Sequence, residues 1–282
     1  MTPTNYEEII SPKRSIMFLN VRALWRYKDL ILLFVHRDFV AQYKQTILGP
    51  LWFIIQPVLT ALMFYVVFSR IATIPTNGVH PFLFYFTGLA VWNYFSECLT
   101  KTSSTFISNA NIFGKVYFPR LTVPISIVIS GLLKLFIHLL ILTLLIVVFY
   151  FQGWQKIDID WSLSLLPIYI LLLALMGLGL GILFSALTTK YRDLTYLLTF
   201  GVQLLMYATP VIYPLRFTQG FLHKAISYNP LTSVVENFRF SLFGIGSFDG
   251  IGLLYTAGCS IGMLMLGVFV FNRVEQSFMD TV

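Results

Sequence analysis

The stretch from Thr122 to Phe151, TVPISIVISGLLKLFIHLLILTLLIVVFYF, decides the fold class. It runs for thirty residues with one lysine, one histidine and no acidic residue. A helix of about twenty apolar residues crosses the roughly 30 Å hydrocarbon core of a bilayer. We therefore predict a transmembrane helix here, one that is tilted or projects beyond the membrane because it is longer than a crossing requires.

The composition of the whole chain points the same way. Hydrophobic residues make up 57% of the 282 residues, and charged residues make up 11%. Soluble domains average about 45–50% hydrophobic residues and about 25% charged residues. So little charge cannot cover the surface of a soluble fold of this size. The apolar runs are continuous, which excludes the short alternating strands of porin-like barrels. We predict an all-α, multi-span membrane protein.

Six apolar segments are long enough to be spans. They run from about Leu51 to Ser69, Phe82 to Leu99, Thr122 to Phe151, Leu163 to Leu187, Leu194 to Tyr213 and Ile251 to Phe271. This divides the chain into an N-terminal region (1–50), a transmembrane domain (51–272) and a tail (273–282). We expect no cleavable signal peptide, because the first apolar run follows about fifty charged and polar residues.

The basic residues define the orientation. The net charge is +7, and thirteen of the nineteen Lys and Arg residues fall on the side that carries both termini. Five fall on the other side and Lys134 lies within a span. Cytoplasmic segments carry the excess of Lys and Arg. Both termini and the loop at about 101–121 are therefore predicted to be cytoplasmic.

Two further segments have membrane-surface patterns. Residues Val21 to Lys44 mix charges with apolar residues at helical spacing, which predicts a helix in the cytoplasmic interface or a plain solvated helix. The proposed apolar positions are Trp25, Leu32, Val35, Phe39 and Tyr43. The external segment at about 214–250 is too apolar for an ordinary loop. We predict that it forms two short re-entrant helices and a gate.

Several kinds of chemistry are not supported by motifs. No Gly-rich loop followed by Lys-Ser/Thr occurs, so we expect no nucleotide site and no catalysis. His36, His80, His138 and His223 form no pair at metal-ligand spacing, and no metal or other cofactor is expected. Cys98 and Cys259 lie in apolar runs, so no disulfide framework is predicted. Asp158 and Asp160 resemble the acidic pair of glycosyltransferases only weakly.

A charge inside a span needs an explanation. Lys134 lies about twelve residues into its helix, and it either reaches back to the inner headgroups or meets a phosphate on a transport path. Glu97 is expected to be solvated near a cytoplasmic end. Aromatic residues make up 17% of the chain and could form a lipid belt or line a canal on which sugars slide. The canal candidates are Trp52, Phe53, Tyr65, Trp92, Tyr94 and Tyr207.

A series of short motifs resembles one known family across about residues 30–272. The series consists of Arg37-Asp38-Phe39, Tyr43-Lys44-Gln45, Leu48 to Trp52, Gln56-Pro57, NANIFGKVYFPR from Asn109 to Arg120, Pro124, Tyr191-Arg192-Asp193, TPVIYP from Thr209 to Pro214, Asn229-Pro230, Glu236 and Phe238-Arg239. Their order resembles the permease subunits of type-2 ABC exporters that carry O-antigen, capsule and teichoic-acid polymers. Gln42 departs from the basic residue often found there, which weakens a phosphate contact at that position.

The resemblance implies a homodimer of six-span subunits driven by two separate ATPase subunits, which bind ATP and Mg. It also implies a coupling helix at about Asn109–Phe118 that docks on the ATPase, with Pro119 and Pro124 breaking helix continuity. The implied coupling residues are Asn109, Ile112, Phe113, Lys115, Tyr117, Phe118, Arg120, Tyr191, Arg192 and Asp193. The last three could equally form contacts or an ion pair within the subunit.

The leading hypothesis is a permease that exports a polyprenyl-diphosphate-linked polysaccharide. Arg26 and Arg37 would attract the diphosphate at the inner surface. The external gate would involve Pro210, Tyr213, Asn229, Pro230, Glu236 and Arg239. The rivals are a small-molecule or drug exporter of the same fold, a membrane glycosyltransferase using Asp158 and Asp160, and a membrane scaffold. No nucleic-acid partner is expected, because the basic residues form no patch.

Overall fold

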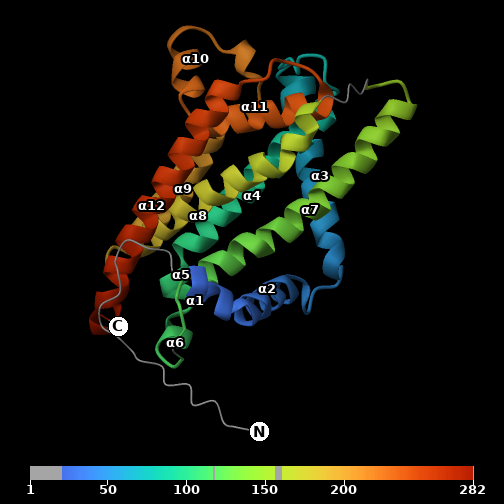
Figure 1. The fold of residues 1–282 in the computed structure, drawn as a ribbon. Helices are drawn as coiled ribbons and strands as arrows, with labels where there is room; N and C mark the ends of the chain where they lie inside the picture. The colour runs from blue at the N-terminus through green and yellow to red at the C-terminus, as the bar shows by residue number, and fades with distance from the viewer. Residues whose placement is uncertain (1–20, 117, 156–160, 282) are drawn as a thin grey trace.

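The computed structural model describes residues 21–116, 118–155 and 161–281, and every regular element in these ranges is helical. Helices occupy all six segments predicted to be spans (Figure 1). They are α3 (Trp52–Phe64) with its π-helical continuation η2 (Tyr65–Ile71), α4 (Pro81–Ser103), α7 (Thr122–Phe151), α8 (Leu166–Lys190), α9 (Leu194–Tyr207) and α12 (Gly250–Thr281). The helix predicted from Thr122 to Phe151 has the same bounds as α7.

Four helical stretches in the described residues are long and apolar enough to cross a membrane. They are Gly49–Ile71, Thr122–Phe151, Trp161–Lys190 and Gly250–Val274. The first begins with the 3-10 turn η1 (Gly49–Leu51), and the third with η3 (Trp161–Leu165). Helix α4 is long enough but more polar, and α9 has only 14 residues. The chain is therefore a multi-pass helical membrane protein.

Helix α8 is the centre of the bundle, between α4 and α12. Its glycines let the neighbouring backbones approach closely. A Cβ at Gly179 would lie 2.6 Å from the backbone nitrogen of Leu264, and a Cβ at Gly177 would lie 3.2 Å from the carbonyl oxygen of Phe95. Small residues at helix contacts are typical of membrane bundles, where close van der Waals packing replaces the hydrophobic effect.

The shorter helices gather at the two ends of the bundle (Figure 1). The α5–α6 end carries α1 (Val21–Arg26), α2 (Lys28–Tyr43), α5 (Thr105–Ser108), α6 (Ala110–Phe113) and the end of α12. The opposite, α10–α11 end carries η4 (Leu215–Phe217), α10 (Gly220–Ser227) and α11 (Pro230–Phe243). The chain thus places the predicted coupling loop and the predicted gate at opposite ends.

The predicted interface helix differs from α1 and α2 in two ways. It is interrupted at Tyr27, and its buried side chains are Leu24, Ile31, Phe34 and Val35. Trp25 and Leu32, which we assigned to the apolar face, are 73% and 59% exposed. The reason is tertiary: α2 packs along α7, and Phe34 contacts Phe118 with ring centroids 5.8 Å apart. Helical spacing alone does not identify which face meets a neighbour.

Three boundaries also differ from the sequence prediction. Helix α9 ends at Tyr207 instead of Tyr213, before a turn that contains Pro210. Helix α12 continues to Thr281, so the tail at 273–281 extends the last helix. Pro124 does not break α7, because it lies in the first turn, where a missing N–H is tolerated. The external segment does contain two short helices, α10 and α11, and most of α11 is buried.

Candidate functional site

The predicted coupling segment is a compact loop rather than one helix. Of the described residues between Asn109 and Phe118, only Ala110–Phe113 form a helix. Phe113 and Phe118 are buried, with ring centroids 5.5 Å apart, and Phe113 also packs against Phe106 at 6.0 Å. These two phenylalanines face the protein core. Their burial leaves little of either ring for a contact with an ATPase, and their coupling role stays a prediction.

Two polar residues of the loop are also turned inward. Arg120 is buried, and its guanidinium lies over the rings of Phe106 and Phe113 at 5.9 and 5.8 Å. Asn109 is buried and donates from Nδ2 to the carbonyl oxygen of Thr105 at 3.0 Å. Phe106 stacks on Phe271 of α12, 4.6 Å between centroids. The loop is thus tied to α12, and Asn109 and Arg120 are turned inward, so their coupling role stays a prediction.

A different set of residues forms the outer surface of the loop, which we call the coupling surface. Lys115 is exposed and Ile112 is half-buried. Ile107 and Val116 are 47% and 60% exposed, and the sequence analysis missed both. Ile107 precedes the buried Phe113, and Val116 lies between Phe113 and Phe118, so the sequence offers apolar residues beyond the two that are buried. Tyr117 lies outside the described residues.

The second predicted coupling segment is also on the surface. Tyr191, Arg192 and Asp193 are all exposed, directly after α8. Thr188 donates from Oγ1 to the carbonyl oxygen of Ser103 at 3.0 Å, which holds this end of α8 beside the end of α4. In the described part of the chain, Arg192 and Asp193 form no ion pair. The geometry favours the contact interpretation over the pair within the subunit.

The predicted gate residues come together around one buried arginine. Arg239 of α11 is 3% exposed, and its Nη1 and Nη2 donate to the carbonyl oxygens of Pro210 and Val211 at 2.5 and 2.6 Å. Its guanidinium lies 3.6 Å from the ring centroid of Phe84 in α4. We call this arrangement the arginine clamp. It fixes the turn that ends α9 against α4 and α11.

The remaining gate candidates stabilise the same turn. Glu236 lies 3.6 Å from Arg239 Nη1 and accepts from the backbone N–H of Leu215 at 3.3 Å. Asn229 donates from Nδ2 to the Ala208 carbonyl and to Thr209 Oγ1, both at 2.9 Å. Tyr213 donates to the Tyr207 carbonyl at 2.6 Å. Pro230 begins α11 directly after Asn229. The sequence therefore identified a real cluster.

The proposed canal residues do not line one surface. Trp92 and Tyr94 are 5% and 3% exposed, so neither faces a canal or lipid, and their assignment to the substrate path is wrong. They belong to α4, which packs against α7 and α8 and buries most of its side chains. Trp52 and Tyr207 are 45% and 60% exposed, and Phe53 stacks on Phe39 at 5.1 Å.

Ion pairs partly neutralise the charged residues that were proposed for the substrate path. Lys134 forms an ion pair with Glu97, and Glu97 also pairs with Lys101 at 2.5 Å. The Lys134 side chain is only 13% exposed. Glu97 is thus a bridge between α4 and α7 and not a simply solvated acid. In the N-terminal helices, Arg26 is exposed, whereas Arg37 is half-buried, pairs with Asp38 at 2.8 Å and lies over Phe34 at 4.7 Å.

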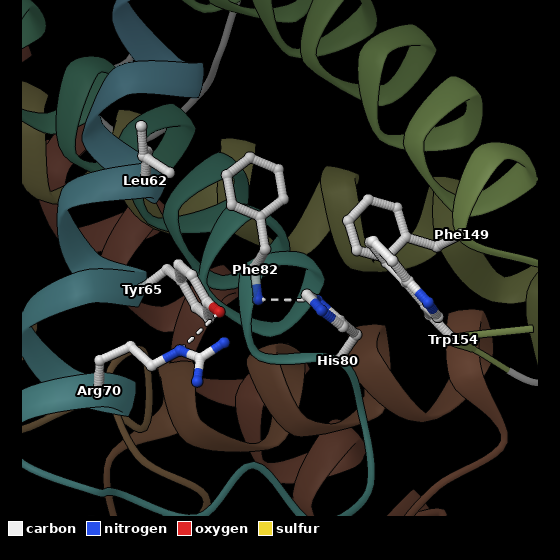
Figure 2. A pocket seen from close by; sticks show the side chains of 7 residues that line it. All are labelled: Leu62, Tyr65, Arg70, His80, Phe82, Phe149 and Trp154. Atoms are coloured by element: carbon white, nitrogen blue, oxygen red, sulfur yellow. Dashed lines mark hydrogen bonds between the residues drawn. The ribbon is translucent and has the colours of Figure 1, made fainter. Parts of the chain in front are cut away.

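Tyr65 lines a pocket at the α10–α11 end of the bundle, together with Leu62, Arg70, His80, Phe82, Phe149 and Trp154 (Figure 2). Its hydroxyl accepts from Arg70 Nε at 2.7 Å. The pocket has a volume of about 660 Å³ and draws on η2, the start of α4 and the end of α7. Sequence reasoning selected only Tyr65, because the other residues are spread over more than ninety positions.

The fold and these clusters define a multi-pass membrane protein with a compact loop at one end and a clamped turn at the other. Comparison with known families identifies it further: residues 29–243 match the ABC-2 type transporter family, and the chain belongs to that family. It is 30% identical over 255 residues to the O-antigen export system permease protein RfbA of Klebsiella pneumoniae, covering 89% of this chain and 94% of that protein. It is 27% identical over 266 residues to the RfbA of Myxococcus xanthus, covering 93% and 98%. The resemblance inferred from the motifs is confirmed.

Proposed function

We propose that this chain is the permease of an ATP-driven exporter that moves a polyprenyl-diphosphate-linked polysaccharide across the inner membrane. The observation that carries the proposal is the match to O-antigen export permeases over almost the full length of both chains. The motifs of the coupling loop, the clamp and α2 lie within residues 29–243, which match the ABC-2 type transporter family. A small-molecule exporter of the same fold is not favoured by these relatives.

In this function the six long helices cross the membrane, and the α5–α6 end is cytoplasmic. The excess of Lys and Arg in the N-terminal region and in the loops of that end supports this orientation. The 23 residues of α4 span about 35 Å at 1.5 Å per residue. The 14 residues of α9 span only about 21 Å, and the clamped turn from Ala208 to Pro214 supplies the remaining depth.

The permease acts as a homodimer with a separate ABC ATPase. Helices α3 and α9 are among those whose apolar surfaces the single chain leaves exposed. In α3 these include Leu59 and Met63, and in α9 Leu197, Phe200 and Leu204. Only 6% of the first apolar stretch is buried. A second copy docked along α3 and α9 would enclose a passage between the subunits, through which the glycan threads as they part.

The ATPase supplies the energy, with ATP and Mg bound in that partner. It docks on the coupling surface and on residues 191–193, and nucleotide binding moves these loops relative to the bundle. Arg26 and Arg37 at the inner surface attract the diphosphate of the substrate. The Arg37–Asp38 pair leaves the guanidinium half exposed for that contact. Replacing both arginines by Ala should halt export without disrupting assembly.

The decisive test is reconstitution of the full chain, with its ATPase, in proteoliposomes that contain a polyprenyl-diphosphate-linked oligosaccharide. We expect glycan to cross the membrane only when both proteins and hydrolysable ATP are present. The catalytically inactive ATPase provides the matched control. Transport by this chain alone down an ion gradient, or efflux of small drugs with no glycan movement, would contradict the proposal.

A further inference from the structure

The pocket around Arg70 has an aromatic wall built on a histidine. The ring of His80 lies 6.0 Å from that of Trp154 at an interplanar angle of 13°, and 6.1 Å from that of Tyr65 at 27°. Phe149 contacts His80 edge-on at 4.4 Å. Figure 2 shows these rings around the pocket together with Leu62, Phe82 and Arg70. Trp154 is 61% exposed, so it is accessible to a ligand.

His80 is held in place by its own backbone and by a distant side chain. Its N–H donates to Gln155 Oε1 at 2.7 Å, and its Nδ1 accepts from the N–H of Phe82 at 3.3 Å. The second bond caps the first turn of α4. Because one hydrogen bond holds the backbone of His80 and the other holds its ring at Nδ1, the wall is preformed and does not need to be ordered by a ligand.

The charge of the pocket is positive and is concentrated at its mouth. Arg70 is exposed, lies over the Tyr65 ring at 5.3 Å, and bonds to the Tyr65 hydroxyl through Nε. This leaves the two Nη groups directed away from that bond (Figure 2). Burial, with added repulsion from Arg70, lowers the pKa of His80, so its ring is neutral at pH 7. No carboxylate is present among the described lining residues.

These features match one ligand chemistry. An arginine with free Nη groups binds phosphate oxygens in a bidentate manner. An exposed indole face stacks on the C–H face of a sugar ring, since the π face is electron-rich. The apolar side chains of Leu62 and Phe82 accommodate the start of a lipid chain. A headgroup that joins lipid, phosphate and sugar presents these three chemistries in that order.

We propose that this pocket binds the phosphate-linked sugar of a glycolipid in the outer leaflet, with Arg70 on the phosphate and Trp154 on the first sugar ring. The choice of glycolipid rests on the proposed function, whereas the phosphate site rests on the pocket itself. The pocket lies on α3, α4 and α7, away from the exposed face of α9. It would hold the lipid end after translocation, before it leaves sideways into the membrane.

The test measures binding to the full purified chain in detergent by native mass spectrometry. The probe is a short-chain polyprenyl diphosphate that carries a disaccharide. We expect Arg70→Gln to weaken binding at least tenfold and Trp154→Ala at least threefold. Arg70→Lys, which keeps the charge, should retain most of the affinity. Arg216→Gln and Phe151→Ala are matched controls, because both side chains are exposed at or near this end but do not line the pocket.

Competing probes separate the sources of phosphate. The same polyprenyl diphosphate without sugar should bind through Arg70 but be insensitive to Trp154→Ala. Equal competition by inorganic phosphate or by phosphatidylglycerol would overturn the glycolipid assignment. Binding unchanged in a folded Arg70→Gln variant, as judged by thermal unfolding, would overturn the site. If binding does not depend on Arg70 but the reconstituted exporter still transports glycan, the proposed function stands and the site does not. If the wild-type exporter does not transport glycan, the proposed function fails and the binding result still stands.

Discussion

The guanidinium of Arg239 fills the space where a side chain at Gly88 would lie. A Cβ at Gly88 would overlap Arg239 Nη2 and lie 2.9 Å from the carbonyl oxygen of Val211. Arg239 of α11 can therefore reach the turn that ends α9 only because residue 88 of α4 has no side chain. One contact connects three elements that are far apart in the sequence.

Gly88→Ala should weaken the arginine clamp. The added methyl group must displace a buried guanidinium that makes two hydrogen bonds, and overpacking of this kind costs about 1–3 kcal/mol. We expect a lower midpoint of thermal unfolding in detergent and reduced export. Gly258→Ala, where a Cβ meets nothing within 4 Å, is the matched control and should behave like the wild type. An unchanged midpoint for Gly88→Ala would show that the clamp is looser than described.

The coupling loop offers a second prediction, because its residues divide into two groups. Phe113→Ala should destabilise the permease itself by about 3–5 kcal/mol, since the ring is buried among aromatic neighbours. Val116→Asp should leave the thermal midpoint of the isolated permease unchanged but reduce copurification of the ATPase at least fivefold. Equal ATPase recovery with Val116→Asp and with the matched variant Val116→Thr would contradict the docking role.

This division marks what the sequence could and could not reveal. The motif NANIFGKVYFPR is recognisable as one unit, and its place in the ordered series of motifs identified the family. The inward direction of Phe113 and Phe118 depends on contacts with Phe106, Phe34 and α12, which no local spacing encodes. The same limitation explains Trp92 and Tyr94. Aromatic residues in a span are equally compatible with lipid, a canal or a core.

The spans themselves were predictable because hydropathy depends only on composition over about twenty residues. The bounds of α7 follow from this directly. Hydropathy does not predict the early end of α9, because Ala208 to Tyr213 is apolar enough to continue a helix. What ends it is Pro210, together with an arginine that captures the freed carbonyl groups from 29 positions away. The gate residues were found by motif, whereas their common centre at Arg239 required the structure.

The exposed face of α9 leads to a third prediction, about the dimer. In a chain in which Cys259 is replaced by Ser, a cysteine at Leu204 should form a cross-link between two copies in membranes under mild oxidation. Cys98 is buried and can remain. Met265→Cys is the matched control: it is 68% exposed on α12, and we expect it to face lipid. Comparable cross-linking at both positions would contradict a dimer interface along α9.

The ion pair between Glu97 and Lys134 gives a fourth prediction, in which the two partners are not equivalent. Glu97 contacts both Lys134 and Lys101, whereas in the described residues the only carboxylate contact of Lys134 is with Glu97. Glu97→Gln leaves a lysine that is 13% exposed without a counter-charge, and removing one partner of such a pair costs about 3–5 kcal/mol. Lys134→Met should cost clearly less, because Glu97 keeps Lys101. The double variant should recover most of the stability that Glu97→Gln loses, as measured by thermal unfolding. Normal export by that double variant would establish that Lys134 is structural, and abolished export in a stable double variant would instead restore it to the substrate path.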